Sequence, residues 1–593
     1  NLKPHSYASV SSDSKTIPSA LDKPPRSLRE VHRLPQQTRS MYLDSLVKEY
    51  MGLWNRGMFK LVRRCDLPPG TPVFPTTTVF KMKFNADGSP DRAKARVCVR
   101  GDLMIPGRDF GAINSPTTQC ESVKLMLSEC PAQKLTAVTY DIQQAFTYGK
   151  TDPSRCTVIE QFPGTEKILD ADTNEELVMK LINRLYGDPA APRAFHLELV
   201  KAYMEFVCEG GNAWKQSKAD PCVFYMQCSD GSWLKSAIFV DDSCTTFKPG
   251  SCAHQTYLQF VQFLKTRFDL KDNMDGMDQI KSFLGMNLTW DEDGKWLRID
   301  QPHAIEKLVI GSGADVSIPK FTPLPPSTEV MLNDCPDLTT VDGLADAAYM
   351  KSKPYRKRIG EALWIARTSR PDIQPAVAKL STVCNNPGPK HWELTDYLIQ
   401  YLHHTRHLGL LYTEGGSTYP YGFVDAAFSP HYGNDDDDYR SFEGWLFKNS
   451  GAPIAWSARF QKNLCMSSSE AEYYGLTSAA MKAVHLTQLC NELGIYSDEP
   501  FLLYEDNKAA IKMSENSSNS KRTIHLDRRA HYIREQVNNG SIQLDYCPTK
   551  LMEADMMTKI MPRPGFEDLR SRVGLSYAHA SQLTPRMKDS LSR

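Results

Sequence analysis

Apolar residues recur every three or four positions along several long stretches of the chain. This spacing places them on one face of a helix and therefore predicts helices. The clearest examples are at 41–62, 252–268, 356–384, 391–407 and 467–493. Other patterned segments are short and rich in β-branched and aromatic residues, which is typical of strands.

Turn residues divide the β-rich segments into strands and hairpins. Residues 77–102 predict a hairpin with Asp87-Gly88 at its turn. Residues 134–146 are a β-rich run that leads into a helix, and 231–247 are two runs on either side of an aspartate pair. Further patterns are a strand before a helix at 294–309, a hairpin at 444–458, and a strand before a helix at 500–515.

These patterns predict an α/β and α+β architecture in several domains. A length of 593 residues is enough for about three or four domains. Residues 1–38 are rich in Ser, Lys and Pro and predict a flexible lead-in. A Pro-rich stretch at 318–343 predicts a hinge or linker. Gly415-Gly416 then opens a new pattern of antiparallel strands, helix, strand and helix.

Composition excludes several classes of protein. Lys plus Arg equals Asp plus Glu at 70 each, so the net charge is zero. A zero net charge neither supports nor excludes nucleic-acid binding, because such binding depends on local basic patches. The 15 cysteines contain no CxxC pair, which argues against a zinc ribbon and a secreted disulfide framework. No apolar stretch approaches the roughly 18 residues that span a bilayer. Because the first forty residues lack Met, we expect a fragment or a piece of a longer polyprotein.

Two adjacent carboxylates, Asp241 and Asp242, end an apolar run in KSAIFVDDSCTTF. Like charges repel, and apolar neighbours raise the cost of ionising both groups. A hairpin tip is one interpretation, since Asp is a good turn residue. A divalent-metal site is the other, because hard cations bind carboxylate oxygens and cancel the repulsion. Asp141, about 100 residues earlier, would join such a site if the two β-rich runs were neighbouring strands.

A second set of acids comes from four different predicted elements. Asp425 lies in a strand, Glu470 begins a long helix, Asp506 ends the run FLLYED, and Asp555 lies in EADMMTK. Four acids of this kind are typical of the active site of a two-metal hydrolase. The alternative is structural, because Glu470 suits a first helical turn and Asp506 suits a helix cap.

Several short motifs follow one another in a fixed order. After Asp141 come RLYGDPAAPRAF, FVDD, SFLGM and SRPDI, and later VDAAFS, RSFEGWLF, SSSEAEYYG, EDNKAAI and EADMMTK. The first group resembles the reverse transcriptase of copia-type LTR retrotransposons, whose pattern has a D-x-x-x-A-F motif, LYGLKQAPRAW, YVDD, YFLG and RPDI. The second group is similar to the RNase H domain of the same family. The resemblance covers about residues 40–570.

The resemblance implies a right-hand polymerase with fingers, palm and thumb, a connection segment, and an α/β RNase H-like domain. The expected divisions are fingers and palm at 39–290, thumb and connection at 291–410, RNase H at 411–575, and a C-terminal tail at 576–593. Each of two active sites would hold two Mg²⁺ or Mn²⁺ ions. The resemblance assigns catalytic and metal-binding roles to Asp141, Asp241 and Asp242 in one site, and to Asp425, Glu470, Asp506 and Asp555 in the other.

Five further residues are expected from the resemblance to contact substrate. Lys94 and Arg96 match a fingers strand that clamps the incoming triphosphate, with a solvated basic strand as the alternative. Phe146 stands at the position of an aromatic steric gate against a 2′-hydroxyl, with an ordinary core Phe as the alternative. Arg193 would position the nucleotide, and Phe239 stands where the family has Tyr.

A few positions depart from the family pattern or have a second interpretation. Ala190 replaces a Gln that contacts the nucleotide sugar, and Asp188 is expected to add negative charge near the phosphate path. The segment TIHLDRRAHYIRE has the spacing of metal ligands, but a helix surface is expected there. The run DDDD at 435–438 predicts a solvated loop, because neighbouring charges cannot all face one ion.

The predicted function is DNA synthesis on RNA and DNA templates, with hydrolysis of RNA in RNA–DNA hybrids, for retrotransposon replication. The expected partners are an RNA template, a DNA or tRNA primer, deoxynucleoside triphosphates, and the capsid protein and integrase of the same element, but no membrane. A cytoplasmic virus-like particle is the expected location, with the nucleus as an alternative. The rival is a catalytically impaired or co-opted nucleic-acid-binding relic, which the presence of all seven carboxylates disfavours. RNA-templated RNA synthesis is disfavoured by an RNase H half.

Overall fold

The computed structural model describes residues 24–84, 90–152, 154–272, 279–326, 328–429, 440–515 and 531–577. The chain forms two compact units. The first comprises Asn1–Pro116 and Ile142–Glu205, and the second comprises Thr117–Asp141 and Phe206–Arg593. The predicted mixture of α/β elements in several parts is confirmed. In the described part of the chain, no helix combines the length and apolar character that a membrane crossing requires.

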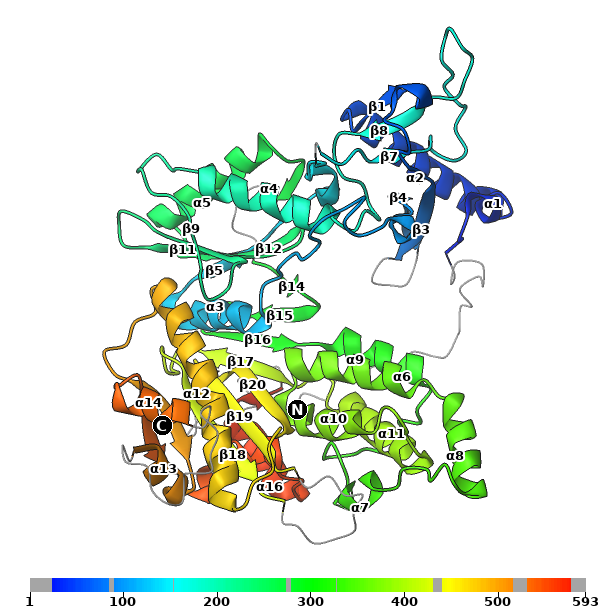
Figure 1. Ribbon diagram of the computed structural model, residues 1–593. Helices are drawn as coiled ribbons and strands as arrows, with labels where there is room; N and C mark the ends of the chain where they lie inside the picture. The colour runs from blue at the N-terminus through cyan, green and yellow to red at the C-terminus, as the bar shows by residue number, and fades with distance from the viewer. Residues whose placement is uncertain are drawn as a thin grey trace, which may run out of the picture. The chain divides into compact units, whose positions relative to one another are not determined.

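A long helix packs against a two-stranded hairpin in the first unit (Figure 1). The helix is α2 (Gln36–Asn55), and the strands are β3 (Thr76–Phe84) and β4 (Pro90–Val99). Alternation along β3 turns Phe80 and Met82 to one face, where they share a core with Tyr42 of α2. The predicted hairpin is therefore present, and its turn lies outside the described residues.

The helical pattern over 41–62 is interrupted in the structure. Gly57 has a φ of +61°, a left-handed conformation that ends the helix, and a strand follows. That strand belongs to a sheet in the order β1-β8-β7-β2, formed by β1 (Phe59–Val62), β2 (Val73–Phe74), β7 (Val158–Ile159) and β8 (Val178–Leu181). The short 3₁₀ helix η3 (Ala145–Tyr148) contacts α4 (Ala191–Glu205).

The second unit contains a seven-stranded sheet that carries the first set of aspartates. Its order is β13-β6-β12-β11-β10-β9, with β5 also paired to β12. The strands are β5 (Thr136–Val138), β6 (Tyr140–Ile142), β9 (Lys215–Gln216), β10 (Val223–Gln227), β11 (Trp233–Phe239), β12 (Asp242–Phe247) and β13 (Leu270–Asp272). Helices α3 (Cys120–Gln133) and α5 (Cys252–Lys265) both contact β11. The two strands predicted within 231–247 are confirmed.

A second sheet and a group of helices follow in the same unit. The sheet order is β14-β15-β16-β17-β23, formed by β14 (Ser282–Phe283), β15 (Met286–Trp290), β16 (Trp296–Asp300), β17 (Gly409–Thr413) and β23 (Leu575–Ser576). The helices are α6 (Pro302–Ser312), α7 (Thr328–Leu332), α8 (Val341–Lys351), α9 (Tyr355–Thr368), α10 (Gln374–Thr382) and α11 (Pro389–His404). Ile359, Val377 and Leu398 join α9, α10 and α11 in one core.

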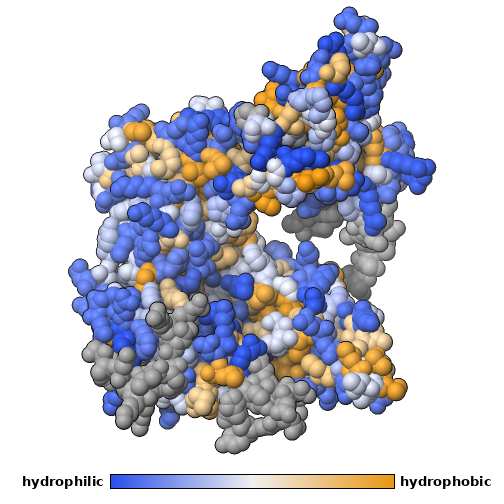
Figure 2. Space-filling model, in the orientation of Figure 1, coloured by the Kyte–Doolittle hydropathy of each residue, from blue (hydrophilic) through white to orange (hydrophobic). Residues whose placement is uncertain are grey.

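The Pro-rich stretch at 318–343 is partly helical, because it contains α7 and the start of α8. Thr340 caps α8, since its hydroxyl accepts a hydrogen bond from the Gly343 amide at 3.0 Å. Figure 2 shows hydrophobic surface at the position of α8, where Val341 and Leu344 are exposed. Hydrophobic side chains thus remain uncovered on this helix in the described part of the chain.

The C-terminal part of the second unit is a five-stranded mixed sheet in the order β20-β19-β18-β21-β22. Strands β18, β19 and β20 are antiparallel, whereas β21 runs parallel to β18 and β22. The strands are β18 (Tyr421–Ala427), β19 (Phe442–Asn449), β20 (Ala452–Phe460), β21 (Phe501–Glu505) and β22 (Ile542–Tyr546). The helices are α12 (Ser468–Glu492), α13 (Lys508–Glu515), α14 (His531–Asn538), α15 (Asp555–Thr558) and α16 (Arg563–Val573).

The two faces of this C-terminal sheet are covered by different helices. On one face, the indole of Trp445 donates a hydrogen bond to Ser478 of α12 at 3.0 Å. On the other face, Gly444 lies so close to Met557 of α15 that an added Cβ would clash with it. Because Asp425 pairs with Gly444 across the ladder, Asp425 lies on the α15 face.

One hydrophobic core runs through the three sheets of the second unit. It contains Leu125 of α3, Ile299 of β16, Ile454 of β20 and Leu476 of α12. Helix α3 contacts β16, β17 and β20 directly. The predicted boundaries after residues 290 and 410 therefore lie inside one packed unit.

Candidate metal centres

The first set of aspartates meets at one end of the seven-stranded sheet. Asp141 of β6 pairs directly with Asp242 of β12, although about 100 residues separate them in sequence. Phe239 of β11 also pairs with Asp242, so only Val240 and Asp241 form the loop between β11 and β12. Antiparallel pairing therefore brings the three carboxylates to one place, in both a hairpin turn and a candidate metal site.

The surroundings of these aspartates favour a cation. Burial, together with the neighbouring carboxylates of Asp241 and Asp141, raises the pKa of Asp242 to about 6. A cation between the three groups would cancel this repulsion. These three carboxylates are less closely grouped than the C-terminal acids described next. In the C-terminal group, one oxygen atom from each carboxylate lies within 4.8 Å of the others.

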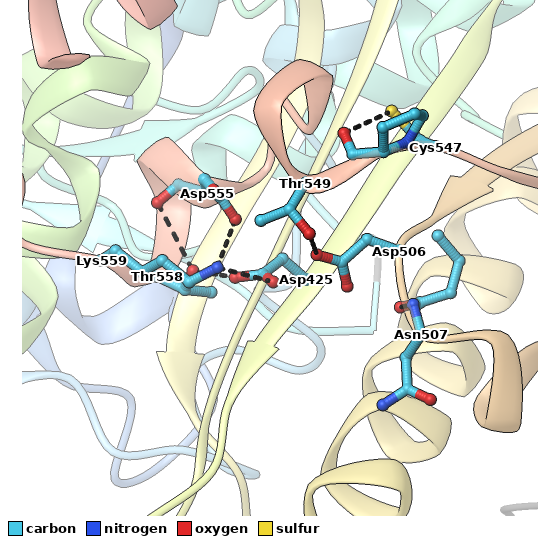
Figure 3. A network of polar contacts seen from close by, with 10 residues as sticks. Asp425, Asp506, Asn507, Cys547, Thr549, Asp555, Thr558 and Lys559 are labelled. Atoms are coloured by element: carbon cyan, nitrogen blue, oxygen red, sulfur yellow. Dashed lines mark hydrogen bonds and ion pairs between the residues drawn. The ribbon is translucent and has the colours of Figure 1, made fainter.

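Asp425, Asp506 and Asp555 form a compact group in the C-terminal part (Figure 3). Phe423 of β18 pairs with Tyr504 of β21, and continuing this parallel register by two residues places Asp506 beside Asp425. Asp555 is the first residue of α15, which covers the same face of the sheet. One oxygen atom from each of the three carboxylates lies within 4.8 Å of the other two.

Hydrogen bonds and one lysine hold this group in position. The ammonium of Lys559 lies 2.5 Å from Asp555 and 3.3 Å from Asp425. The hydroxyl of Thr558 donates to Asp425, and that of Thr549 donates to Asp506 at 2.8 Å (Figure 3). Lys559 therefore supplies a positive charge where the carboxylates are closest.

Burial dominates the electrostatics of the same group. It raises the pKa of Asp425, and it raises the pKa of Asp555 to about 6. Burial opposes charge on Lys559 too, but the Asp425 and Asp555 carboxylates outweigh it and raise the lysine pKa to about 12. The site thus attracts positive charge strongly, as a divalent-metal site requires.

The structure places Glu472, and not Glu470, among the C-terminal acids. Glu470 lies in the first turn of α12, where its carboxylate accepts a hydrogen bond from the Met466 amide at 2.7 Å. Glu472 forms a second carboxylate group with Glu505 and Asp506. We therefore replace Glu470 by Glu472 in the proposed site.

A sequence signal for Glu472 was present in the helical spacing. Leu476, Ala479 and Ala483 are fully buried, and Glu472 precedes Leu476 by one turn on the same face of α12. Glu470 is two positions earlier and lies off that face, which suits a capping role. Glu505 gave no comparable signal, because it is simply the last residue of an apolar strand.

The donor set fits divalent cations of the Mg²⁺ class in both places. Such ions prefer carboxylate oxygens, and each candidate site supplies three or more. In the C-terminal site, one buried oxygen of Glu472 and one of Glu505 have no hydrogen-bond partner among the described residues. Buried acceptors without a partner are rare in folded proteins, and a bound cation would satisfy them.

Four of the predicted substrate residues lie in the first unit. Lys94 and Arg96 lie two positions apart on β4 and therefore share one face of the hairpin. The guanidinium of Arg96 lies 5.4 Å from the ring centroid of Tyr186, and Phe146 packs edge-on against the same ring at 5.7 Å. Arg193 donates a hydrogen bond to the Asn114 carbonyl at 2.8 Å.

The remaining departures from the pattern have structural roles. Asp188 is buried and forms an ion pair with Arg184 at 2.7 Å, so its negative charge is neutralised locally. It also accepts a hydrogen bond from the Ala190 amide at the start of α4. The expectation of added negative charge near a phosphate path is therefore wrong. Phe239 is half-buried and pairs with Asp242 across the hairpin, without the hydroxyl that a Tyr would carry at this position.

Two expectations fall wholly or partly outside the described residues. The acidic run at 435–438 lies there, as do His525 and Asp527 of the segment with metal-ligand spacing. His531 of that segment is described and begins α14. Among the described residues, neither group of clustered acids includes it.

Comparisons with known proteins cover nearly the whole chain. A family model described as "Reverse transcriptase (RNA-dependent DNA polymerase)" matches residues 58–325. The chain is 30% identical over 554 residues to a retrovirus-related Pol polyprotein from transposon TNT 1-94 of Nicotiana tabacum, covering 93% of this chain and 39% of that protein. It is 28% identical over 515 residues to the Pol polyprotein from transposon RE1 of Arabidopsis thaliana, covering 86% and 32%. The chain thus spans less than half of the length of these relatives.

Among solved structures, RNase H1 from the halophilic archaeon Halobacterium salinarum NRC-1 matches 23% of this chain and 93% of its own, at 14% identity and a TM-score of 0.17. The family model and the plant relatives point to the same family as the sequence motifs. The chain therefore belongs to the copia-type retrotransposon Pol polyproteins and contains their reverse transcriptase domain.

Proposed function

We propose that the chain synthesises DNA on RNA and DNA templates and hydrolyses RNA in RNA–DNA hybrids. The observation that carries the first activity is the pairing of Asp141 with Asp242 beside Asp241 in a chain with a reverse transcriptase domain. The second activity is supported by the clustering of Asp425, Asp506 and Asp555. Two separate carboxylate centres suit two separate reactions on phosphodiesters.

In the polymerase centre, Asp141 and Asp241 would hold two Mg²⁺ or Mn²⁺ ions, and Asp242 would lie beside the primer end. When bound, such ions activate the attacking oxygen and stabilise the leaving oxygen of an in-line displacement. Lys94 and Arg96 would bind the triphosphate of the incoming nucleotide through charge-assisted hydrogen bonds. Phe146 would exclude a 2′-hydroxyl, with Arg193 and Phe239 positioning the nucleotide and primer.

In the hydrolytic centre, Asp425, Glu472, Asp506 and Asp555 would hold two further ions. These carboxylates would hold ions that activate an attacking water and stabilise the leaving oxygen at a phosphodiester of the RNA strand. Lys559, which contacts Asp425 and Asp555 now, would turn toward solvent or the phosphate when cations enter. Thr549 and Thr558 keep the aspartates in their orientation.

The further assignments belong to the same proposal. The fingers and palm would occupy 39–290 of a right-hand polymerase, the thumb and connection 291–410, and the RNase H domain 411–575. The partners would be an RNA template, a DNA or tRNA primer, a hybrid, deoxynucleoside triphosphates, and the capsid protein and integrase of the element. A cytoplasmic particle, or the nucleus, would be the place of action.

Primer extension on poly(rA)/oligo(dT) with Mg²⁺ tests the polymerase assignment. The wild-type chain should incorporate deoxythymidine, and Asp241→Asn should reduce incorporation by more than about 100-fold, because a direct metal ligand matters more than the outer-shell partners that cost 10- to 100-fold. Equal incorporation by both proteins would contradict the assignment. No incorporation by the wild type would favour a nucleic-acid-binding relic.

Cleavage of a labelled RNA strand in a hybrid tests the second assignment. Asp506→Asn should abolish cleavage but leave primer extension intact, because Asp506 belongs to the C-terminal group only. Asp241→Asn should show the reverse pattern. Loss of both activities in either folded variant would contradict two separate centres.

A further inference from the structure

Glu472, Glu505 and Asp506 form a carboxylate group on the α12 side of β21. One oxygen atom from each residue lies within 4.8 Å of the other two, and Asp506 also belongs to the group with Asp425 and Asp555. Glu505 is the last residue of β21, and strand alternation turns it to the face opposite Asp506. The two groups therefore lie on either side of the end of β21 and share one aspartate.

Glu505 is completely buried, with 0% of its surface exposed, and Glu472 is 6% exposed. The Oε1 atom of Glu505 accepts a hydrogen bond from the Asn507 amide at 3.0 Å. Its Oε2 atom is buried and has no hydrogen-bond partner in the described part of the chain, and the same holds for Oε2 of Glu472. Two unsatisfied acceptors thus lie in the same small space.

The charged groups that act on these two glutamates offer no compensation. The carboxylates of Glu505, Asp425 and Asp506 raise the pKa of Glu472, and those of Asp425 and Asp506 raise the pKa of Glu505, both on top of burial. Lys559 is engaged on the other side with Asp425 and Asp555. A buried acidic cluster of this kind is stable only with extra protons or with a bound cation.

We propose that Glu505 is a direct ligand of a divalent cation held jointly by Glu472, Glu505 and Asp506. This inference rests on the proposed hydrolytic function, and it adds a fifth carboxylate to that centre. Hard cations of the Mg²⁺ and Mn²⁺ class bind such oxygens, and the unsatisfied Oε2 atoms of both glutamates are available to them. The role of Glu505 is therefore distinct from packing at a strand end.

Direct Mn²⁺ binding to the full chain tests the proposal without nucleic acid. The background variant Asp241→Asn/Asp425→Asn weakens both the polymerase centre and the neighbouring hydrolytic group, so the remaining tight binding reports on Glu472, Glu505 and Asp506. In that background, Glu505→Gln should weaken Mn²⁺ binding by about 10-fold or more, as loss of metal-site partners does. The matched control Glu499→Gln, an exposed acid just before β21, should bind like the background protein. Equal binding by Glu505→Gln would overturn the proposal.

Thermal unfolding gives a second readout that a merely structural Glu505 would not move. In EDTA, Glu505→Gln should unfold at a higher temperature than wild type, because an amide removes carboxylate repulsion. Mn²⁺ should raise the melting temperature of the wild type more than that of Glu505→Gln. The same Mn²⁺ increment in both proteins would refute the role. If Glu505→Gln does not fold, Glu505→Asp replaces it, because it keeps the carboxylate. Glu505→Asp should retain part of the rise in melting temperature that Mn²⁺ produces. A rise as large as that of the wild type would refute the proposed role of Glu505.

Hybrid cleavage measured in parallel separates this proposal from the function on which it rests. A wild-type chain that binds Mn²⁺ through Glu505 but never cleaves RNA would refute the hydrolytic function and keep the metal site. A wild-type chain that cleaves RNA while Glu505→Gln binds Mn²⁺ normally would keep the function and refute the metal site. The two failures are therefore distinguishable.

Discussion

Lys124 is a single buried residue that contacts several elements of the second unit. It lies on α3, is 2% exposed, and places its ammonium 3.5 Å from the ring centroid of Trp456 on β20. The same ammonium donates to the Arg367 carbonyl at 3.4 Å, near the end of α9. Burial lowers the pKa of Lys124 to about 8, despite the opposing influence of Cys120 and Glu121.

This shift predicts a pH dependence of stability. Below pH 8 both the folded and unfolded chains hold the proton, so the folded chain carries the full cost of a buried charge. Between pH 8 and about 10.5 only the unfolded chain keeps the proton, and the Lys124 contribution to stability therefore rises with pH. Lys124→Met should stabilise the protein at pH 7, by about 1–3 kcal/mol as for other buried charges replaced by apolar groups.

Chemical unfolding of both proteins from pH 7 to 10.5 measures the effect. The difference in unfolding free energy between Lys124→Met and wild type should shrink across that range, since other titrating groups cancel in the comparison. Lys390→Met is a suitable control, because the Lys390 ammonium pairs with Asp334 at 3.3 Å and its side chain is exposed. A difference that stays constant with pH would contradict the shift.

At the level of single elements, the orientation of helix α12 decides which of two nearby glutamates lies in the hydrolytic centre. The Ser467 hydroxyl accepts a hydrogen bond from the Glu470 amide and caps the helix. Both glutamates are buried, but Glu470 belongs to the capping turn, whereas Glu472 lies on the helix face that meets Glu505 and Asp506. A shift of two residues along a helix changes the direction of a side chain by more than half a turn.

Substitution of the two glutamates should therefore have opposite outcomes. Glu472→Gln should lower hybrid cleavage by more than about 100-fold, beyond the 10- to 100-fold cost of losing an outer-shell partner. Glu470→Gln should keep cleavage within a few-fold and lower the unfolding free energy by about 0.5–1 kcal/mol, because it weakens a first-turn interaction. Hybrid-cleavage rates of the two folded proteins measure this directly. Greater loss of cleavage in Glu470→Gln would contradict the assignment.

The hairpin of β11 and β12 is the second element with a specific constraint. Val240 occupies its two-residue loop with a φ of +58°, a left-handed conformation that a β-branched residue adopts at a cost of about 1–2 kcal/mol. The strain is maintained by pairing on both sides, from Phe239 with Asp242 through Lys235 with Thr246. The loop therefore holds Asp241 in a defined orientation.

Val240→Gly should remove the strain and loosen the loop. We expect a rise of up to about 1 kcal/mol in unfolding free energy and a several-fold slower primer extension, with unchanged hybrid cleavage. Ser450→Gly is the matched control, since Ser450 has a φ of +48° in the loop between β19 and β20, away from both centres. It should stabilise to a similar extent and leave both activities unchanged. Faster extension by Val240→Gly would contradict the interpretation.

At the scale of the whole molecule, the second unit has one core rather than separate ones. Helix α3 lies against β16, β17 and β20, and Asn449 donates a hydrogen bond to Ser128 at 2.8 Å across this contact. Lys482 of α12 pairs with Glu121 of α3 at 2.5 Å. The carboxylate set near β12 and the set near β21 therefore belong to one packed body.

One cooperative transition should follow from this shared core. Leu125→Ala in α3 and Ile454→Ala in β20 should each cost about 2–5 kcal/mol, because each leaves a cavity at a fully buried position. Both changes should shift the same thermal transition, and heating should inactivate primer extension and hybrid cleavage together. Leu464→Ala, at a position that is 55% exposed, should stay within about 0.5 kcal/mol of wild type. Separate inactivation temperatures would contradict a single core.

Much of the local structure follows from the sequence, because its causes are local. Alternating apolar residues and turn residues predict the hairpin of β3 and β4 and the strands around Asp241. The helix predicted over 41–62 ends early, because one glycine with a positive φ outweighs the apolar spacing on either side. Local patterns also place Asp141 and Asp506 at strand ends.

The sequence by itself determined the family, the order of the elements and most of the acids that carry the proposed chemistry. Only the tertiary structure decided which acids meet, because strand register and helix orientation join residues far apart in the chain. The pairing of Asp141 with Asp242 and the entry of Glu472 in place of Glu470 are of this kind. So is the burial of Glu505, whose unsatisfied oxygen exists only because α12 covers the end of β21.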